Sequence, residues 1–410
     1  MKYVIIGNSA AAAGAVEGIR GIDKSSPITI ISKEKYHIYS RPLISYYLCG
    51  KTDLQRMKYR PDDFYEKNGC SCIFGEAAIK IDKDKKAVML ESGKEVEYDK
   101  LLVATGSSPF VPPIKGLEKV NKKFTFMSLD DALALEKELG SEKKVLIVGA
   151  GLIGLKCAEG IKDRVGEITV IDLSERVLSS ILDSEGSERV KKHLESEGLK
   201  LILGHTVSEF DESSAVTDSG EKIDFDILVL ALGVRPNISL LTEIGAQAGR
   251  GIKTADSMET SIEGIFCAGD CCESHDVSSD QDRILALLPN AYRQGEIAGI
   301  NMAGGNAGFD RAIPMNAIGF FGLHIITAGT YDGEVFEKSD EKSYKKLFCK
   351  DGYLVGYIMV GNVEKAGIYT SLIQNRIPLS DIDFGLIFEK PSLMAFSRKY
   401  RNEKLGGRIQ

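Results

Sequence analysis

A glycine-rich turn at residues 149–154 is the feature that most limits what this chain can fold into. The turn reads Gly149-Ala150-Gly151-Leu152-Ile153-Gly154, follows the apolar run 144–148 and precedes a helical stretch to about residue 164. A second apolar run, 168–171, ends in Asp172. This is the full Gly-x-Gly-x-x-Gly fingerprint of a βαβ motif, whose glycines let the backbone approach a pyrophosphate at a helix N-terminus. The residues predicted to contact a dinucleotide here are Gly149, Gly151, Leu152, Ile153 and Gly154.

A similar motif begins the chain. The apolar run 3–6 leads into Gly7-Asn8-Ser9-Ala10-Ala11-Ala12, an Ala- and Gly-rich helical stretch, and a second apolar run at 28–31. Serine takes the middle glycine's place, which the fingerprint tolerates, and two such motifs indicate an internal duplication. The residues predicted to contact a second dinucleotide are Gly7, Ser9, Ala10 and Ala11.

In each motif, an acid that binds ribose hydroxyls is expected near the end of the second strand. Asp172 stands there in the motif at 149–154, and a carboxylate at this point also repels a 2′-phosphate, so NADH is favoured over NADPH. Arg176 keeps NADPH open, because an arginine can pair with that phosphate. In the first motif the strand ends in Ser32, so Glu34 is the candidate acid and Lys33 its rival.

Three more segments complete a characteristic order. They are Tyr98-Asp99-Lys100-Leu101-Leu102-Val103-Ala104-Thr105-Gly106-Ser107, Ala231-Leu232-Gly233-Val234-Arg235-Pro236-Asn237, and the strand and turn that end in Gly269-Asp270. Together with the two glycine-rich turns, they resemble the FAD-dependent pyridine nucleotide-disulfide oxidoreductases. Any one of these motifs is weak evidence, whereas five in register are highly specific.

The resemblance implies an α/β fold with two Rossmann-like nucleotide-binding domains. An FAD domain of residues 1–112 and 241–308 would carry an inserted NADH domain of residues 113–240. Residues 309–410 would form a small α+β domain, similar to that of NADH:rubredoxin reductases and of the flavin half of assimilatory nitrite reductases. Within this last part, 320–323 and 344–358 look like strands with an Asp351-Gly352 hairpin turn, followed by a helix near 366–374.

The resemblance also implies further cofactor contacts. Asp270 would face the ribityl hydroxyls and pyrophosphate of FAD. The segment 289–295 would open a helix whose N-terminal N–H groups stabilise negative charge on the reduced flavin, although an ordinary helix start is the alternative. The remaining residues assigned to cofactor binding are Arg41, Pro42, Ala104, Thr105, Gly106, Gly233, Gly269 and Asn290.

Two positions depart from the family pattern. Related ferredoxin reductases carry a lysine after the serine that corresponds to Ser45, and here Tyr46 takes that place. Members commonly have glutamate two residues after the last glycine of the NADH fingerprint, where this chain has Lys156. Glu159, about one helical turn further on, is predicted to replace that acid, and Arg41 to contact the flavin or a phosphate.

Cys49 divides the functional hypotheses. The chain has eight cysteines, but neither the Cys-x4-Cys pair of classical disulfide reductases on this helix nor the Cys-x-x-Cys of thioredoxin reductases. NADH oxidases, peroxidases and coenzyme A disulfide reductases use one cysteine in a setting that resembles 44–50, where a thiolate beside the flavin would react with peroxide or disulfide. The alternative is that Cys49 is a small apolar residue that ends a helix before Gly50.

Composition excludes other classes of function. The 52 basic and 59 acidic side chains give a net charge of −7, which disfavours nucleic acid, and the cysteines and histidines lack metal-site spacing. No apolar stretch is long enough for a membrane span and no leader pattern follows Met1, so we expect a cytoplasmic protein without membrane partners.

The sequence therefore predicts an FAD-dependent NADH:acceptor oxidoreductase. The acceptor would be rubredoxin, a related iron–sulfur protein or a small molecule. One alternative is an NADH oxidase, peroxidase or disulfide reductase that uses Cys49. Another is a flavin-containing redox sensor with little turnover. The oligomeric state is open between monomer and homodimer.

Overall fold

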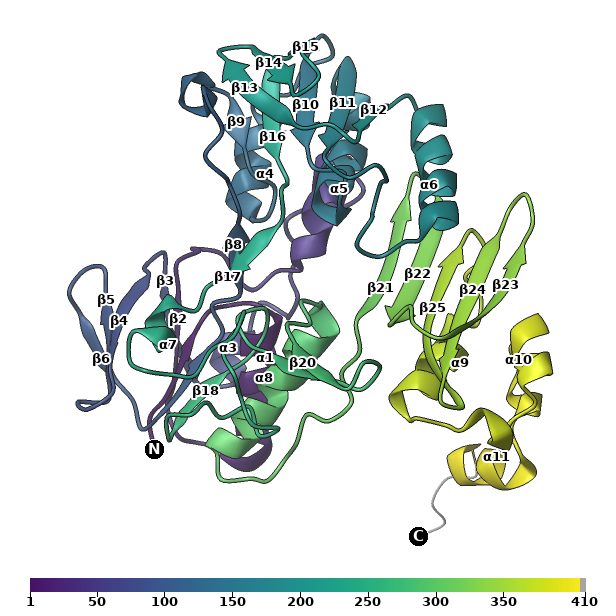
Figure 1. The fold of residues 1–410 in the computed structure, drawn as a ribbon. Helices are drawn as coiled ribbons and strands as arrows, with labels where there is room; N and C mark the ends of the chain where they lie inside the picture. Colours follow the sequence, from purple (N-terminus) through teal and green to yellow (C-terminus); the bar gives the residue numbers. More distant parts are fainter. Residues whose placement is uncertain (406–410) are drawn as a thin grey trace. The chain divides into compact units, whose positions relative to one another are not determined.

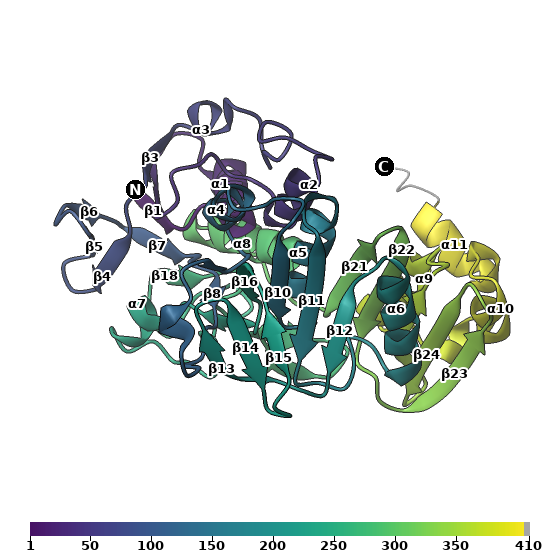
Figure 2. The same cartoon turned by 90° about the horizontal axis from the view of Figure 1, so that it is seen from above.

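The structure is a computed structural model that describes residues 1–405, and it consists of two compact units (Figures 1 and 2). The larger unit contains residues 1–180, 191–274 and 282–310. The smaller unit contains residues 181–190, 275–281 and 311–405. Each unit has its own sheets and core.

A five-stranded parallel sheet in the order β18-β7-β1-β2-β3 forms the first layer of the larger unit. Its strands are β1 (Tyr3–Ile6), β2 (Ile28–Ser32), β3 (Cys70–Phe74), β7 (Lys100–Val103) and β18 (Ile265–Cys267). All four residues of β1 are buried, as expected for a parallel strand covered on both faces. The late strand β18 returns to pair with β7, so the chain leaves this sheet and rejoins it.

Two helices, α1 (Ala10–Ile22) and α8 (Leu288–Met302), pack closely in this layer. A Cβ added at Gly14 would lie 2.1 Å from the carbonyl oxygen of Tyr292, and one at Gly295 would lie 1.9 Å from that of Ala11. Gly18 and Gly299 make similar approaches. The absence of these side chains lets the two helix backbones touch.

A second parallel sheet, in the order β12-β11-β10-β16-β9, is built from residues between β7 and β18. Its strands are β9 (Lys123–Phe124), β10 (Lys144–Val148), β11 (Glu167–Asp172), β12 (Lys200–Leu203) and β16 (Ile227–Leu230). The helices of this region are α4 (Leu129–Glu136) and α5 (Leu152–Ile161), while α6 (Ser184–Ser196) begins in the smaller unit and ends in the larger one. A small antiparallel sheet adds β13 (Val207–Asp211), β14 (Ser214–Thr217) and β15 (Lys222–Asp224).

The chain passes between the two parallel sheets twice, and the two passages pair with each other. Strand β8 (Ser107–Pro109) pairs antiparallel with β17 (Val234–Pro236). The Thr105 hydroxyl donates to the carbonyl of Asn237 over 2.8 Å, and the Asn237 amide donates to the carbonyl of Thr105 over 2.9 Å. These contacts hold the two crossings together.

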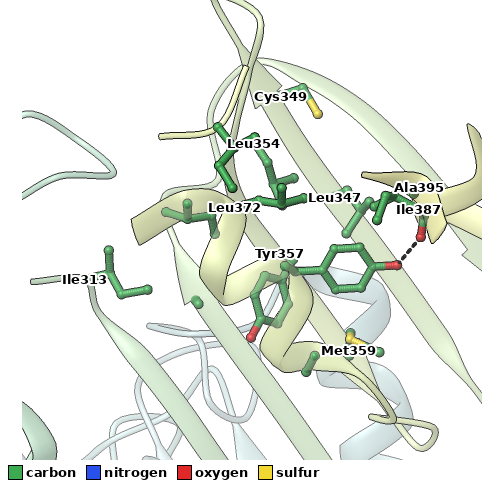
Figure 3. Close-up of a cluster of buried hydrophobic side chains, with 14 of the residues drawn as sticks. Ile313, Leu347, Cys349, Leu354, Tyr357, Met359, Leu372, Ile387 and Ala395 are labelled. Atoms are coloured by element: carbon green, nitrogen blue, oxygen red, sulfur yellow. Dashed lines mark hydrogen bonds between the residues drawn. The ribbon is translucent and has the colours of Figure 1, made fainter. Parts of the chain in front are cut away.

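The smaller unit contains an antiparallel sheet in the order β21-β22-β25-β24-β23. Its strands are β21 (Met315–Phe320), β22 (Leu323–Gly329), β23 (Glu334–Ser339), β24 (Tyr344–Lys350) and β25 (Tyr353–Val360). Figure 3 shows its core around Leu347, Tyr357 and Leu372. The Tyr369 hydroxyl donates to the carbonyl of Ile387 over 2.9 Å. The helices here are α9 (Ala366–Gln374), α10 (Phe384–Glu389) and α11 (Arg398–Leu405).

The prediction of a strand at 320–323 is wrong. Residues 320–323 are the hairpin turn between β21 and β22, because Phe321 and Gly322 have φ angles of 48° and 89°. The predicted Asp351-Gly352 turn joins β24 to β25, with φ angles of 51° and 78°. Positive φ at both central residues is the type of turn that antiparallel hairpins favour.

The remaining elements are short. They are α2 (Ile44–Leu48), α3 (Phe64–Lys67), α7 (Ser239–Thr242), β4 (Ala78–Asp82), β5 (Ala87–Leu90), β6 (Glu95–Glu97), β19 (Ser274–Asp276), β20 (Gln281–Arg283) and five 3-10 turns: Arg41–Leu43, Leu117–Lys119, Lys162–Arg164, Leu379–Asp381 and Leu393–Ala395. The predicted fold class is confirmed, while the limits 1–112, 113–240, 241–308 and 309–410 stay predictions.

Candidate functional site

The first glycine-rich turn joins β1 to α1. Gly7 has a φ of +120°, and a Cβ there would lie 2.1 Å from the carbonyl oxygen of Ala104. Ser9 is the N-cap of α1, and its side chain makes no capping hydrogen bond. Ala10 and Ala11 are buried behind it. The turn therefore presents a helix N-terminus without side-chain bulk, which suits the pyrophosphate of a dinucleotide.

The second turn repeats this geometry at the end of β10. Gly149 also has a φ of +120°, and its Cβ would lie 2.3 Å from the carbonyl oxygen of Ala231. A Cβ at Gly154 would lie 2.0 Å from the Gly149 carbonyl, whereas Gly151 faces open space. Leu152 and Ile153 begin α5. The open side at Gly151 leaves room for a ligand at the N-terminus of α5.

Asp172 is the last residue of β11 and lies beside this second turn. One carboxylate oxygen accepts from the backbone N–H of Ala150 over 2.6 Å, and the other accepts from that of Ser174 over 2.7 Å. Both contacts fix the carboxylate at the end of the strand. This is the place from which an acid binds the adenosine ribose of a dinucleotide.

Glu34 and Arg41 meet beyond the end of β2. The Arg41 guanidinium bonds one carboxylate oxygen of Glu34, and the Tyr39 hydroxyl donates to the other over 2.6 Å. Burial raises the pKa of Tyr39, so its hydroxyl stays a donor. Lys33, the rival of Glu34, is exposed, and so is Pro42. The structure therefore joins Glu34 to Arg41 and leaves Lys33 outside this cluster.

The Gly269-Asp270 turn follows β18. Gly269, with a φ of +86°, donates its N–H to the side-chain oxygen of Gln294 over 2.8 Å. The Ser107 hydroxyl donates to Asp270 over 3.2 Å. Burial raises the pKa of Asp270, opposed by the Ser107 hydrogen bond and by the charge of Arg41. Asp270 is thus close enough to Arg41 for the guanidinium charge to favour the ionised carboxylate.

Helix α8 begins where the sequence predicted, with Pro289 in its first turn and Leu287 as an N-cap without a side-chain hydrogen bond. Asn290 lies in the same turn. At 15 residues, the helix has a macrodipole that favours negative charge at this end. Ala104, Thr105 and Gly106 lie after β7, whereas Gly233 precedes β17 at a φ of +98°.

Glu159 lies where α5 contacts α2. Its carboxylate pairs with the ammonium of Lys156, and the two side chains are 12% and 18% exposed. The Lys156 nitrogen is also 4.8 Å from the centre of the Tyr46 ring. A Cβ at Gly160 would lie 2.9 Å from the Ser45 carbonyl oxygen, so the helices touch at this point.

Cys49 is the C-cap of α2, and its thiol donates to the carbonyl of Tyr46 over 3.4 Å. A helix C-terminus carries negative partial charge, whereas reactive thiolates occur in positively charged surroundings. The eight cysteines, all among the described residues, form no disulfide. Cys157, Cys271 and Cys272 are fully buried.

Two residues of these sites, Tyr39 and Gln294, were not predicted from the sequence. Tyr39 also accepts the N–H of Leu129 over 2.9 Å, and Gln294 is a buried polar side chain on α8. A glutamine on the buried face of a helix is a signal that the sequence offered, since buried polar groups need partners. The contact between Tyr39 and Leu129 had no local signal, because the two residues lie 90 positions apart.

Among the side chains that the structure describes, no three from His, Cys, Asp or Glu lie close enough together to hold a metal ion. No described helix is both long and apolar enough to cross a membrane.

Comparison with known proteins identifies two family models in the chain. Residues 1–295 match the pyridine nucleotide-disulphide oxidoreductase model, and residues 314–377 match the rubredoxin NAD+ reductase C-terminal domain.

Three relatives cover most of the chain. The epsilon subunit of the NADH-dependent phenylglyoxylate dehydrogenase of Aromatoleum evansii is 31% identical over 93% of both chains. The NADH-rubredoxin oxidoreductase of Clostridium acetobutylicum is 30% identical over 88% of this chain and 91% of its own. The NADH oxidase of Methanocaldococcus jannaschii is 34% identical over 75% of this chain and 71% of its own.

Among solved structures, the covalent putidaredoxin reductase–putidaredoxin complex matches with a TM-score of 0.88 at 20% identity. The match covers 100% of this chain and 99% of that one. At this identity the match shows likeness of fold alone.

Proposed function

The chain belongs to the pyridine nucleotide-disulphide oxidoreductase family, and from that premise we propose that it passes electrons from NADH through FAD to a small iron–sulfur protein of the rubredoxin type. The flavin, when bound, supplies the conversion of a hydride into single electrons. The protein's part is to hold both cofactors and to set the charge around them.

The observation that carries this proposal is the pair of glycine turns in one compact unit. Gly7 and Gly149 have the same φ and the same close approach to an alanine carbonyl, and α2 and α5, which follow the two motifs, are in contact. The first turn, with Asp270 and Arg41, suits FAD. The second, with Asp172, suits NADH. The rubredoxin-reductase match at 314–377 supports a protein acceptor.

The experiment is the rate of NADH oxidation by the FAD-loaded protein under two conditions. We expect fast anaerobic reduction of rubredoxin and slow consumption of oxygen in air-saturated buffer. Fast oxygen consumption with no reduction of rubredoxin would refute the proposal and favour the oxidase alternative.

The hydrogen-bonded position of Cys49 leads to a further expected result. Since its thiol donates to the Tyr46 carbonyl at a helix C-terminus, Cys49→Ser should retain rubredoxin reduction within about twofold of wild type. The same variant should leave peroxide and disulfide reduction at their low wild-type rates. Cys70→Ser, in β3, is the matched control. Loss of a fast peroxide or disulfide activity in Cys49→Ser alone would show that Cys49 is redox-active.

A second acceptor class is favoured by the match to the phenylglyoxylate dehydrogenase subunit, which spans 93% of both chains. In that case the acceptor or donor is another subunit of a larger dehydrogenase. Affinity purification of the chain from its native host distinguishes the two, because a bound subunit co-purifies in fixed ratio and a soluble carrier does not.

A further inference from the structure

A lysine and a glutamate form a mostly buried ion pair on α5. Lys156 and Glu159 are 18% and 12% exposed, and they lie three residues apart on one face of the helix. Removing a charge from water is costly unless it is paired and hydrogen-bonded. Burial of these two charges therefore costs hydration free energy that an ion pair on an exposed helix surface would keep.

The ring of Tyr46 fixes the direction of the lysine. The Lys156 nitrogen lies 4.8 Å from the ring centre, within the roughly 6 Å at which cation–π attraction acts. Tyr46 belongs to α2, so the ammonium reaches across from α5. Lys51 approaches the same ring at 5.9 Å, but that lysine is exposed.

The ammonium lies where the two dinucleotide motifs adjoin. Helix α5 begins at the turn 149–154, and Lys156 stands in its first two turns. Helix α2 follows directly on the 3-10 turn Arg41–Leu43. In the first site, Arg41 forms an ion pair with Glu34, and its positive charge favours the ionised form of Asp270. If the two motifs hold FAD and NADH as proposed, this junction between α2 and α5 is the nearest contact between helices that follow the two turns.

We propose that Lys156 is a positioning residue for hydride transfer, whose ammonium, held by Tyr46 and Glu159, stabilises the negative charge that the flavin gains. The hydride leaves C4 of NADH, which becomes NAD+, and the neutral flavin that accepts it carries one negative charge. No further proton or co-reactant is needed. A fixed cation near developing charge lowers the energy of that charged product. The inference rests on the proposed function.

The same arrangement accounts for both departures from the family pattern. Position 46 lacks the lysine of related ferredoxin reductases, and position 156 lacks the common glutamate. In this chain the cation comes from α5 instead of α2, and its carboxylate partner is one turn further along the same helix.

The test is the reduction potential of bound FAD in two variants, measured by anaerobic titration against a redox dye. Lys156→Met leaves the Glu159 carboxylate and should lower the ratio of reduced to oxidised flavin about tenfold, which is about 30 mV for a two-electron couple. Glu159→Gln leaves the ammonium and should raise that ratio. A merely structural role would not move the two variants in opposite directions.

Two variants complete the experiment. Lys156→Arg keeps the positive charge and should retain the wild-type potential, which separates charge from folding. Lys51→Met removes the exposed cation on the same ring and should change the ratio less than twofold.

Shifts in the same direction for Lys156→Met and Glu159→Gln, or ratios of reduced to oxidised flavin within twofold of wild type in both variants, would overturn the inference. Failure of wild type to bind FAD or to be reduced by NADH would instead overturn the proposed function.

Discussion

Gly14→Ala should lower the free energy of unfolding of the larger unit by about 3 kcal/mol or more and abolish its binding of FAD. The new Cβ would lie 2.1 Å from the carbonyl oxygen of Tyr292, and backbone atoms cannot move aside as a flexible side chain can. Helices α1 and α8 would have to separate, and the first glycine turn at the start of α1 would move with them. Thermal unfolding and the flavin absorbance of the purified protein measure both effects.

Gly21→Ala is the matched control, because it lies on the same helix with no atom near its missing Cβ. Alanine there should be neutral or should stabilise the protein by up to about 1 kcal/mol. If Gly14→Ala matched Gly21→Ala in stability and FAD content, close packing of α1 on α8 would not hold the FAD site.

The second large effect concerns the choice of nicotinamide cofactor. Asp172→Ala should lower kcat/KM for NADH by about tenfold to a hundredfold, since hydrogen bonds to a charged group contribute about 1.5 to 3 kcal/mol. The rate with NADPH should not fall in parallel, because the repulsion of its 2′-phosphate is removed. Steady-state kinetics with both cofactors give the ratio.

Asp172 also accepts the N–H groups of Ala150 and Ser174, so a second variant is needed. Asp172→Asn keeps an acceptor oxygen but loses the charge, and its NADH preference should fall as well. Asp224→Ala, an exposed acid on β15, should behave as wild type. An unchanged NADH preference in both Asp172 variants would mean that another residue, such as Arg176, sets the choice of cofactor.

The parts of the fold that local patterns encode were predicted closely. The apolar run 144–148 is strand β10, and the helix expected near 366–374 is α9 with those bounds. Apolar periodicity and glycine turns act over a few residues, so a sequence displays them directly. The nested order of the two sheets came from the motif order and is confirmed by the return of β18 to β7.

Long-range pairing was not predictable. The β8–β17 pair joins residues 107–109 to 234–236, and neither strand has an apolar pattern of its own. The prediction of a strand at 320–323 is wrong because Phe321 adopts a positive φ, which a phenylalanine side chain disfavours. Contacts between residues far apart in the sequence determine the conformation of such segments.

Within the candidate site, single residues were easier to predict than their partners. Glu34 and Arg41 were both proposed as cofactor contacts, but the sequence did not show that they pair. Likewise, the i,i+3 spacing made Lys156 a neighbour of Glu159, while the approach to Tyr46 on another helix required the fold. Spacing along a helix is visible in a sequence, and contact between helices is not.

The glycine contact between α1 and α8 also bears on the order in which the chain folds during synthesis. Gly14 meets Tyr292, which the ribosome adds 278 residues later (292 − 14), or roughly 14 to 56 s at 5 to 20 residues per second. The second sheet, whose strands lie between Lys123 and Leu230, is complete well before that. The inserted domain can therefore fold first, while the alanine-rich face of α1 waits uncovered and open to chaperones.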